Sequence, residues 1–394
     1  MQASRLLGLV AIVAVLAILI YLLASSTGQG SIVISIPSTT SSISLSTSIT
    51  LPTSTTSIVQ NTTVQTSIAP TTVFQASNVT FIINNSQGPA TIAPFQQMIS
   101  FDPHSIPFPS LTTADLGNIR FYEGPSELYS WCESGCGVNS TAAVFWVRLP
   151  SGIPANSLTS VNLTRFSILA NYDSYAGEAP QLSSSYGQHD NGANVFAFYD
   201  NFAERKLDTR TWSLTTNSIG APALGGGLTI ATNGLNATLG IATVESFDPL
   251  TYVYEAKGAL TSLSQSSSVP QFIQILGSGT RQSITLCPKT SSVCLSNVIM
   301  ELNATADIAP ASAVYSNSTA ASYHTYSLWA TLYDTRAQID YGSNVLNQGN
   351  YLPSAYGHLA MGITGKSGNA SIAYYYARIR AQPPFGVMPV ASQQ

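Results

Sequence analysis

One uninterrupted apolar run stands out from the alternating patterns that fill the rest of the chain, and it covers residues 6–24. At a rise of about 1.5 Å per residue, a helix of this length spans roughly 28 Å, close to the hydrocarbon core of a bilayer. Arg5 precedes the run and the next basic residue is Arg120, so the positive-inside rule leaves the N-terminus in the cytoplasm. We predict a transmembrane anchor over residues 1–24 of a single-pass cell-membrane protein whose bulk is extracellular. A cleaved signal peptide is the alternative.

The next segment, residues 25–77, is rich in Ser and Thr, with scattered Ile, Val and Pro and no charged residue. Such low-complexity composition is typical of an extended stalk. The stalk would be either O-glycosylated or a disordered linker without sugar. In both cases it holds the folded part away from the membrane.

From Asn78 onward, short alternating segments rich in Val, Ile, Tyr, Phe and Thr are separated by turn residues, without a long amphipathic helical pattern. The expected fold class is therefore all-β, with two β-sandwich domains. We expect a small β-module over residues 78–170, a linker over 171–195 and a larger sandwich over 196–385. The strands expected in the module cover 95–101, 118–122, 142–149 and 158–168. Those expected in the larger sandwich cover 228–231, 252–260, 271–276, 323–333, 338–341, 359–363 and 372–380.

Three runs in the first block carry a family resemblance: NIRF at 118–121, ELYSW at 127–131 and AVFWVRLP at 143–150. In this order they resemble the family catalogued as domain of unknown function 2341, over about residues 92–169. The resemblance implies a small surface β-module and no catalytic role. Trp131 and Trp146 both lie in apolar strand patterns, so we expect them in the core rather than on a ligand-binding platform.

The second block opens with FYDNF at 198–202, LDTRTW at 207–212 and then GGLTI. This opening is similar to the entry of concanavalin A-like lectin/glucanase jelly rolls. The pairing of a module of unknown function 2341 with this jelly roll resembles archaeal surface proteins, although a fold does not supply a function.

Composition excludes one class of function. Charged residues make up only 8% of the chain and the net charge is −4. A basic patch that could hold nucleic acid is therefore not expected.

Local motifs for catalysis are missing from the sequence. Laminarinase-type enzymes of the resembling fold carry two Glu residues in an E-x-D-x-x-E pattern, an even spacing that places both on one face of a strand. The nearest pair here, Glu245 and Asp248, has odd spacing and precedes Pro249. We expect a protein that is not an enzyme.

Metal ligands are equally sparse. The four His residues are scattered, and His189 with Asp190 indicates a hydrogen-bonded loop rather than a metal site. No cofactor is expected. Calcium stays open, because Asp200 and Asp208 could bind it, although capping of turns is the favoured interpretation.

Four cysteines and nine glycosylation motifs fit an extracellular setting. The short spacings predict two local disulfides: Cys132–Cys136 and Cys287–Cys294. The Asn-x-Ser/Thr motifs are candidates for glycosylation in an exported chain: Asn61, Asn78, Asn84, Asn139, Asn162, Asn236, Asn303, Asn317 and Asn369.

The segment 323–333 offers a candidate ligand face. Alternation places Tyr326 and Leu328 toward the core, and Trp329 and Tyr333 on the opposite face among hydroxyl groups. An indole and a phenol beside hydroxyls suit stacking on sugar rings. The predicted site consists of Trp329, Tyr333, Asp340, Tyr341 and Asn344, and the alternative is that Trp329 is packed inside the sandwich.

Taken with the resemblance, these features predict a non-catalytic surface protein that binds surface glycans or neighbouring surface proteins. A structural envelope component without a specific ligand is the first alternative, and an extracellular glycosidase the second. An aromatic, amide-lined groove would favour glycan binding, whereas a sheet face covered by the partner module would favour the structural role.

Overall fold

The computed structural model describes thirteen stretches of the chain: 76–86, 88–106, 112–166, 171–216, 221–233, 238–263, 269–277, 280–286, 298–303, 311–315, 319–349, 356–364 and 369–394. Within them, no helix combines the length and the apolar character needed to cross a membrane. The predicted anchor, nearly all of the predicted stalk and the cysteines Cys287 and Cys294 lie outside these residues.

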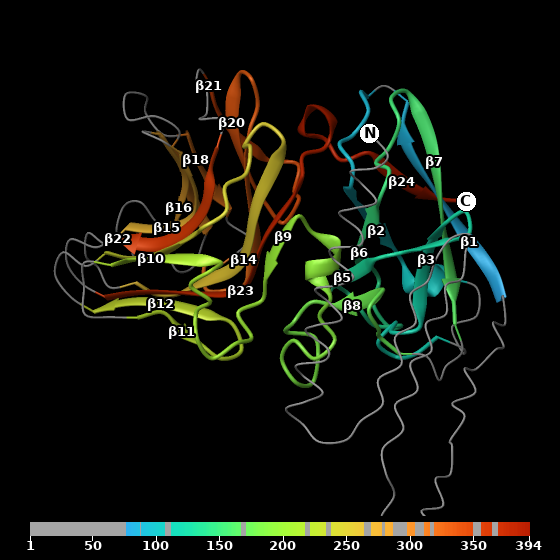
Figure 1. Ribbon diagram of the computed structural model, residues 1–394, viewed down its shortest axis with the longest axis horizontal. Coiled ribbons are helices and arrows are strands. Elements are labelled where there is room, and N and C mark those ends of the chain that lie inside the picture. The colour runs from blue at the N-terminus through green and yellow to red at the C-terminus, as the bar shows by residue number, and fades with distance from the viewer. Residues whose placement is uncertain are drawn as a thin grey trace, which may run out of the picture. The chain divides into compact units, whose positions relative to one another are not determined.

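Residues 70–394 cluster as one compact unit, which contains two β-sandwich lobes (Figure 1). The all-β prediction is confirmed. Helical structure in the described residues is limited to single turns: η1 (Pro103–Ser105), α2 (Gly192–Val195) and η3 (Pro384–Gly386).

The first lobe packs a five-stranded sheet, in the order β24-β1-β7-β3-β4, against a four-stranded sheet, β2-β6-β5-β8. Its strands are: β1 (Ala76–Asn85), β2 (Phe95–Phe101), β3 (Ile119–Glu123), β4 (Ser126–Leu128), β5 (Ser130–Ser134), β6 (Ala143–Leu149), β7 (Ser157–Arg165), β8 (Ala176–Glu178) and β24 (Val390–Gln393). Alternate residues of these strands fill a core that contains Phe81, Phe121 and Phe145. Burial of such large apolar side chains is the main stabilising term of the lobe.

Two strands of the first lobe come from outside the expected module. The expected linker contributes β8, which pairs in parallel with β5. The C-terminal strand β24 returns from the second lobe and pairs with β1 (Figure 1). The first lobe is therefore assembled from separate parts of the chain.

The second lobe packs an eight-stranded sheet, ordered β11-β12-β23-β14-β19-β20-β21 with β9 added beside β23, against a seven-stranded sheet, β10-β13-β22-β15-β16-β17-β18. Its strands are: β9 (Phe198–Asp200), β10 (Trp212–Thr216), β11 (Ala223–Leu224), β12 (Leu228–Asn233), β13 (Thr238–Thr243), β14 (Tyr252–Leu263), β15 (Val269–Gly277), β16 (Thr280–Leu286), β17 (Val298–Asn303), β18 (Ala311–Tyr315), β19 (His324–Ala330), β20 (Asp334–Ile339), β21 (Val345–Gly349), β22 (His358–Thr364) and β23 (Asn369–Ala381). Phe272 lies at the centre of the core, with its ring centroid 4.4 Å from that of Tyr326 and 4.8 Å from that of Tyr374.

Most strands expected from the alternation begin and end within three residues of the observed strand ends. The strand expected at 338–341 does not. The strand there is β20, and it ends at Ile339. Asp340 and Tyr341 follow with φ of 48° and 56°, a left-handed conformation that cannot continue a strand. The predicted strand residue Tyr341 thus lies in a turn.

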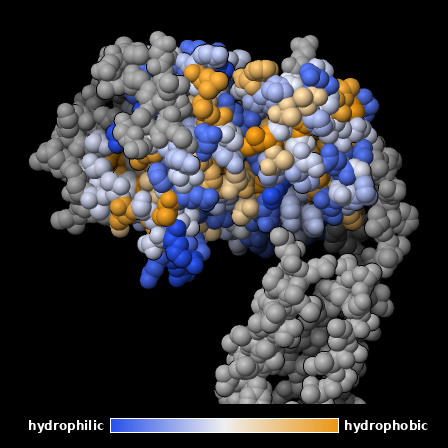
Figure 2. Space-filling model, turned by 45° about the horizontal axis from the view of Figure 1, so that its top comes forward, coloured by the Kyte–Doolittle hydropathy of each residue, from blue (hydrophilic) through white to orange (hydrophobic). Residues whose placement is uncertain are grey.

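The surface matches the composition. Figure 2 shows hydrophobic and hydrophilic residues interspersed over the described part of one face. With only 8% charged residues, solubility depends largely on hydroxyl and amide groups.

Candidate functional site

The two lobes meet at an aromatic cluster. Trp131 and Trp146 of the first lobe pack with Phe196 and with Tyr376 of β23, and all four side chains are at most 5% exposed. The prediction that both tryptophans are core residues is confirmed, but their core is the contact between the lobes. Such a contact excludes water from the polar groups that it encloses.

Arg378 of β23 lies within this cluster and joins two buried carboxylates. Its Nη2 is 3.2 Å from Oε2 of Glu133 in the first lobe, and its Nε is 2.7 Å from Oε2 of Glu255 in the second. Arg380 adds a contact of 2.9 Å to Glu255. The rings of Trp146 and Phe196 lie 4.7 and 4.5 Å from the guanidinium carbon of Arg378, which adds cation–π attraction. We call Glu133, Glu255, Arg378 and Arg380 the interlobe network.

Glu133 is the first lobe's contribution to this network, and donors from several strands surround it. Its carboxylate accepts from Trp146 Nε1 at 2.5 Å, from the Tyr376 hydroxyl at 2.6 Å and from Thr325 Oγ1 at 3.0 Å. Burial alone would raise the pKa of Glu133, but the charges of Arg378 and Lys257 and the hydrogen bonds from Tyr376 and Trp146 outweigh it and lower that pKa to about 2. Glu133 is therefore ionised at neutral pH.

The outward face of the eight-stranded sheet is consequently covered. Every residue of β19 is buried. On one face of the strand, Tyr326 and Leu328 point into the core of the second lobe. On the other face, Thr325 donates to Glu133 and Ser327 donates to Glu255 at 2.8 Å. This is the face on which the sequence predicted stacking on sugar rings.

The five predicted ligand residues do not form one open groove. Trp329 is 3% exposed, and Gly386 of η3 lies against its indole nitrogen. The Tyr341 hydroxyl is 2.8 Å from Glu133 Oε2 and also contacts Arg378. The alternative interpretation, that Trp329 is packed inside the protein, agrees with its position.

The other three predicted ligand residues lie apart. Asp340 accepts from the Thr325 amide at 2.8 Å and lies 2.6 Å from His324 Nδ1, and this hydrogen bond raises the pKa of His324. Tyr333 is 80% exposed and Asn344 is exposed. Their predicted role in ligand binding has no support from a shared cavity.

The disulfide Cys132–Cys136 is formed, and it closes the short loop that begins at Glu133. This prediction is confirmed. The predicted Cys287–Cys294 bond falls outside the described residues.

Replacing both Cys132 and Cys136 by alanine is expected to lower the free energy of unfolding by about 2 kcal/mol, the value for a loop this short. Denaturant titration measures the loss, and reduction of the native protein should reproduce it. An unchanged unfolding midpoint would contradict the expectation.

The predicted glycosylation sites divide by accessibility. Asn84, Asn139 and Asn369 are exposed, and Asn162 and Asn303 are half-buried. Asn78 lies in β1, whereas Asn61, Asn236 and Asn317 fall outside the described residues. Glycosylation stays a prediction.

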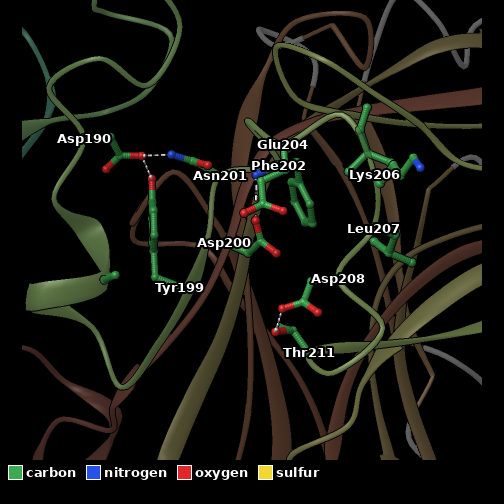
Figure 3. A pocket seen from close by; sticks show the side chains of 12 residues that line it. Asp190, Tyr199, Asp200, Asn201, Phe202, Glu204, Lys206, Leu207, Asp208 and Thr211 are labelled. Carbon is green, nitrogen blue, oxygen red and sulfur yellow. Dashed lines mark hydrogen bonds between the residues drawn. The ribbon is translucent and has the colours of Figure 1, made fainter. Parts of the chain in front are cut away.

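A second feature is open to solvent: a pocket of about 270 Å³, which we call the Asp200 pocket (Figure 3). Its lining residues come from the loop before α2, from α2, from β9, from the segment that leads to β10 and from β11: Asp190, Ala193, Tyr199, Asp200, Asn201, Phe202, Glu204, Lys206, Leu207, Asp208, Thr211 and Leu224. Hydroxyl, amide and carboxylate groups thus surround an accessible space.

Asp200 lies in the middle of this group, between Glu204 and Asp208 (Figure 3). Its carboxylate accepts from the Phe202 amide at 2.7 Å and from Trp212 Nε1 at 2.6 Å. Burial raises the pKa of Asp200, and the charges of Glu204 and Asp208 raise it further. By contrast, the pKa of Asp208 is lowered to about 2, chiefly by its hydrogen bonds from Arg210.

Asp190 connects the pocket to the first lobe. Its carboxylate accepts from Trp131 Nε1 at 2.8 Å, from the Tyr199 hydroxyl at 2.6 Å and from Asn201 Nδ2 at 2.8 Å. Burial raises the pKa of Asp190 despite these bonds. The loop around His189 and Asp190 is hydrogen-bonded, as the sequence indicated.

Asp200 and Asp208 both cap turns. Asp208 accepts from the Arg210 amide at 3.0 Å and from Thr211 Oγ1 at 3.2 Å. Among the described residues, no group of three or more His, Cys, Asp or Glu side chains has a geometry that could hold a metal ion.

The charge distribution of the sequence carries a signal for this pocket, although no catalytic or metal-binding motif marks it. The chain has 14 basic and 18 acidic residues, and six of these charged residues lie within residues 200–210. In so weakly charged a chain, a concentration of this kind marks a place where charge has a specific use.

Parts of the chain are similar to known proteins. Residues 115–215 match the family model described as "Domain of unknown function (DUF2341)". The match extends from the first lobe through β8 and α2 to the beginning of the second lobe. Uncharacterized protein 562 of Sulfolobus islandicus rod-shaped virus 1 is 35% identical over 143 residues, which are 36% of this chain and 24% of that protein. The chain thus spans about a quarter of the length of this relative.

Solved structures resemble close to half of the chain. The β-glucanase of Bacillus licheniformis has 15% identity and a TM-score of 0.36, and the match covers 46% of this chain and 97% of that one. The catalytic domain of the laminarinase from Thermotoga petrophila RKU-1 has 9% identity and a TM-score of 0.38, over 47% and 96% of the two chains. The two resemblances stated from the sequence are confirmed.

This comparison corrects the expectation that the chain is not an enzyme, because the solved structures that resemble it are described as glucanases. The missing E-x-D-x-x-E pattern therefore does not exclude an activity. Likenesses of this size transfer neither a substrate nor a catalytic residue to this chain.

Proposed function

We propose that the chain binds carbohydrate in the Asp200 pocket. The observation that carries the proposal is a cavity of about 270 Å³ in which acceptor and donor groups converge beside the apolar side chains of Phe202 and Leu207. Sugars present many hydroxyl groups together with apolar C–H faces, so this mixture of polar and apolar lining suits them.

The setting of this binding is the outside of a cell. The apolar run at 6–24, the Ser/Thr-rich segment 25–77 and the Cys132–Cys136 disulfide support an anchored extracellular protein. Its partners would be the membrane, through residues 6–24, and glycans or proteins of neighbouring surfaces.

Hydrolysis of the bound carbohydrate is the second candidate function, and the opposite pKa shifts of two carboxyl groups in one pocket favour it. Asp200 has a raised pKa, as a general acid requires. Asp208 has a pKa lowered to about 2, so it stays ionised. Glycoside cleavage commonly uses one protonated and one ionised carboxyl group.

Replacing Asp200 by asparagine should weaken retention of the full-length chain on a glycan array by about tenfold, the value of one charge-assisted hydrogen bond. The amide keeps the shape of the carboxyl group, but it leaves one of the two donors, the Phe202 amide or the Trp212 indole, without an acceptor. The melting temperature should therefore fall modestly, and retention is compared well below it. If the chain also cleaves the glycan that it binds, release of reducing ends should disappear in this variant.

The matched control is Asp248→Asn. Asp248 caps a turn by accepting from the Leu250 amide at 2.9 Å, as Asp200 does, but it does not line the pocket. Equal retention of the Asp200 variant and the native chain would refute the proposed site. It would favour a structural envelope component, the role that the covered face of the eight-stranded sheet supports.

A further inference from the structure

The turn that follows β20 holds two consecutive residues in a conformation that residues other than glycine rarely adopt. Asp340 and Tyr341 have φ of 48° and 56°, and the Gly342 amide donates to the Ile339 carbonyl at 2.9 Å. A positive φ at both central positions is the mark of a type I′ turn, in which Gly usually occupies the second position. Tyr in that position carries backbone strain. Such strain persists only where the surrounding contacts hold the turn in place.

Asp340 supplies several of these contacts, because it is bound to the start of β19. Its amide donates to the Thr325 carbonyl at 2.8 Å, and its Oδ1 accepts from the Thr325 amide at 2.8 Å. Its Oδ2 lies 2.6 Å from Nδ1 of His324. The contact with His324 is the one among these that changes with protonation.

Both ring nitrogens of His324 face hydrogen-bond acceptors. Nδ1 faces the Asp340 carboxylate, and Nε2 lies 3.2 Å from the Thr319 carbonyl. A neutral imidazole has one N–H and can donate to only one of these acceptors, whereas the imidazolium donates to both. His324 is 8% exposed, so water does not readily replace a lost bond. The arrangement is therefore built for the charged form.

Among the described residues, two charged side chains act on His324. The hydrogen bond from Asp340 is the largest influence and raises the pKa of His324, while burial and the charge of Lys257 in β14 oppose it. Tyr326 presents its ring edge-on, with the ring centroids 6.2 Å apart, and Tyr323 stacks on another tyrosine. The net pKa shift is upward, so His324 keeps its proton to a higher pH than in the unfolded chain.

Tyr341 connects the same turn to the first lobe. Its hydroxyl is 2.9 and 2.8 Å from the two carboxylate oxygens of Glu133. Its ring packs against that of Trp146, with the centroids 5.7 Å apart. Because Tyr341 reaches both groups from the strained position of the turn, relaxation of the turn would withdraw it from the first lobe.

We propose that His324, Asp340 and Tyr341 form a pH-dependent latch between the two lobes. The imidazolium of His324 fixes Asp340, Asp340 fixes the strained turn, and the turn places Tyr341 against Glu133. Loss of the His324 proton removes a hydrogen bond and the attraction to Asp340, so the turn relaxes and the lobes separate more often. The described lining of the Asp200 pocket includes none of these residues, so the latch does not depend on carbohydrate binding there.

The direction of the pH effect follows from the raised pKa of His324. The contribution of the latch is fully present below the unfolded value of about 6.5 and is lost as the pH rises through the raised value. Glu133, with a pKa of about 2, and Arg378, with a raised pKa, keep their charges over this range. The pKa of Tyr341 is also raised. A change in the contact between the lobes near neutral pH therefore reports on His324.

The test is cleavage by chymotrypsin after Phe196 in the full-length chain, at about pH 6 and about pH 9. Phe196 is 5% exposed and packs against Trp131 and Trp146, so this bond becomes accessible when the lobes separate, and its cleavage follows the population of the open form. Each rate is divided by that of a short peptide substrate at the same pH. The normalised rate of the native chain should rise about tenfold between the two pH values, the effect of one charge-assisted hydrogen bond.

In His324→Gln the normalised rate should be high at both pH values, because glutamine has no charge to lose. The matched control is His104→Gln. His104 also lies 2.8 Å from an aspartate, Asp102, but that pair is exposed, so its variant should keep the native pH dependence. A pH dependence that persists in His324→Gln, or a native rate that does not rise with pH, would overturn the proposal.

Two further variants test the latch without relying on the fold of the His324 variant. Asp340→Asn keeps a residue that tolerates the left-handed conformation but removes the charge that holds the proton, so its cleavage rate should depend little on pH. Tyr341→Phe should be cut faster at about pH 6, and adding His324→Gln to it should give little further increase, because both changes remove the same contact. Native pH dependence in Asp340→Asn, or additive effects in the double variant, would refute the latch.

Discussion

Replacing Glu133 by alanine is expected to lower the free energy of unfolding by about 3–5 kcal/mol, the usual cost of removing one partner from a buried ion pair. Glu133 is 2% exposed and neutralises Arg378, whose side chain is fully buried. Its removal also leaves the Tyr376 hydroxyl and the Trp146 indole without their acceptor. Denaturant titration measures the loss.

The same variant should loosen the contact between the lobes, because Glu133 is the first lobe's only carboxylate in the interlobe network. Limited proteolysis should then cut the segment between β8 and β9 faster than in the native protein. Glu245→Ala is the control, since Glu245 is exposed. A loss below about 1 kcal/mol, within the range of a surface pair, would show that the network contributes little.

Replacing Arg378 by methionine is expected to reverse the pH dependence of stability. In the native protein the pKa of Glu133 is lowered to about 2. Its contribution to stability is therefore fully present above the unfolded value of about 4.5 and is lost progressively as the pH falls from that value through about 2. Glu133 should accordingly add no stability to the native protein between pH 7 and pH 4, and the melting temperature should begin to fall near pH 4.

Without Arg378, burial dominates the environment of Glu133 and raises its pKa above the unfolded value. Stability is then highest below that value and falls as the pH rises. The Arg378→Met variant should melt at a higher temperature at pH 4 than at pH 7, in addition to an overall loss of about 3–5 kcal/mol at neutral pH. Arg210→Met, at an arginine whose side chain is 90% exposed, should show neither effect. Parallel pH profiles of the native protein and the Arg378 variant would disprove the coupling.

These expectations have a common consequence for function. The interlobe network and its aromatic cluster cover one face of the second lobe, so ligand binding there would require the lobes to separate. The Asp200 pocket is accessible without such a change. Binding experiments should therefore begin there.

Local pattern alone determined a large part of this structure. Period-two alternation predicted β2, β6 and β22 nearly to the residue, and it placed Tyr326 and Leu328 on the core side of β19. The short spacing of Cys132 and Cys136 predicted their bond. Each of these features depends on residues close together in the sequence, which is why the sequence is sufficient to predict it.

Only the tertiary structure decided what covers the outward face of β19. Alternation assigns Trp329 to that face but carries no information about what packs on it. Glu133 and Arg378 are 245 positions apart, and no local pattern connects them. The sequence indicated Asp200 and Asp208 as turn caps, because a turn cap depends on neighbouring residues. It could not indicate that Asp190 completes their pocket, because side chains of separate loops meet only after the sheets have packed.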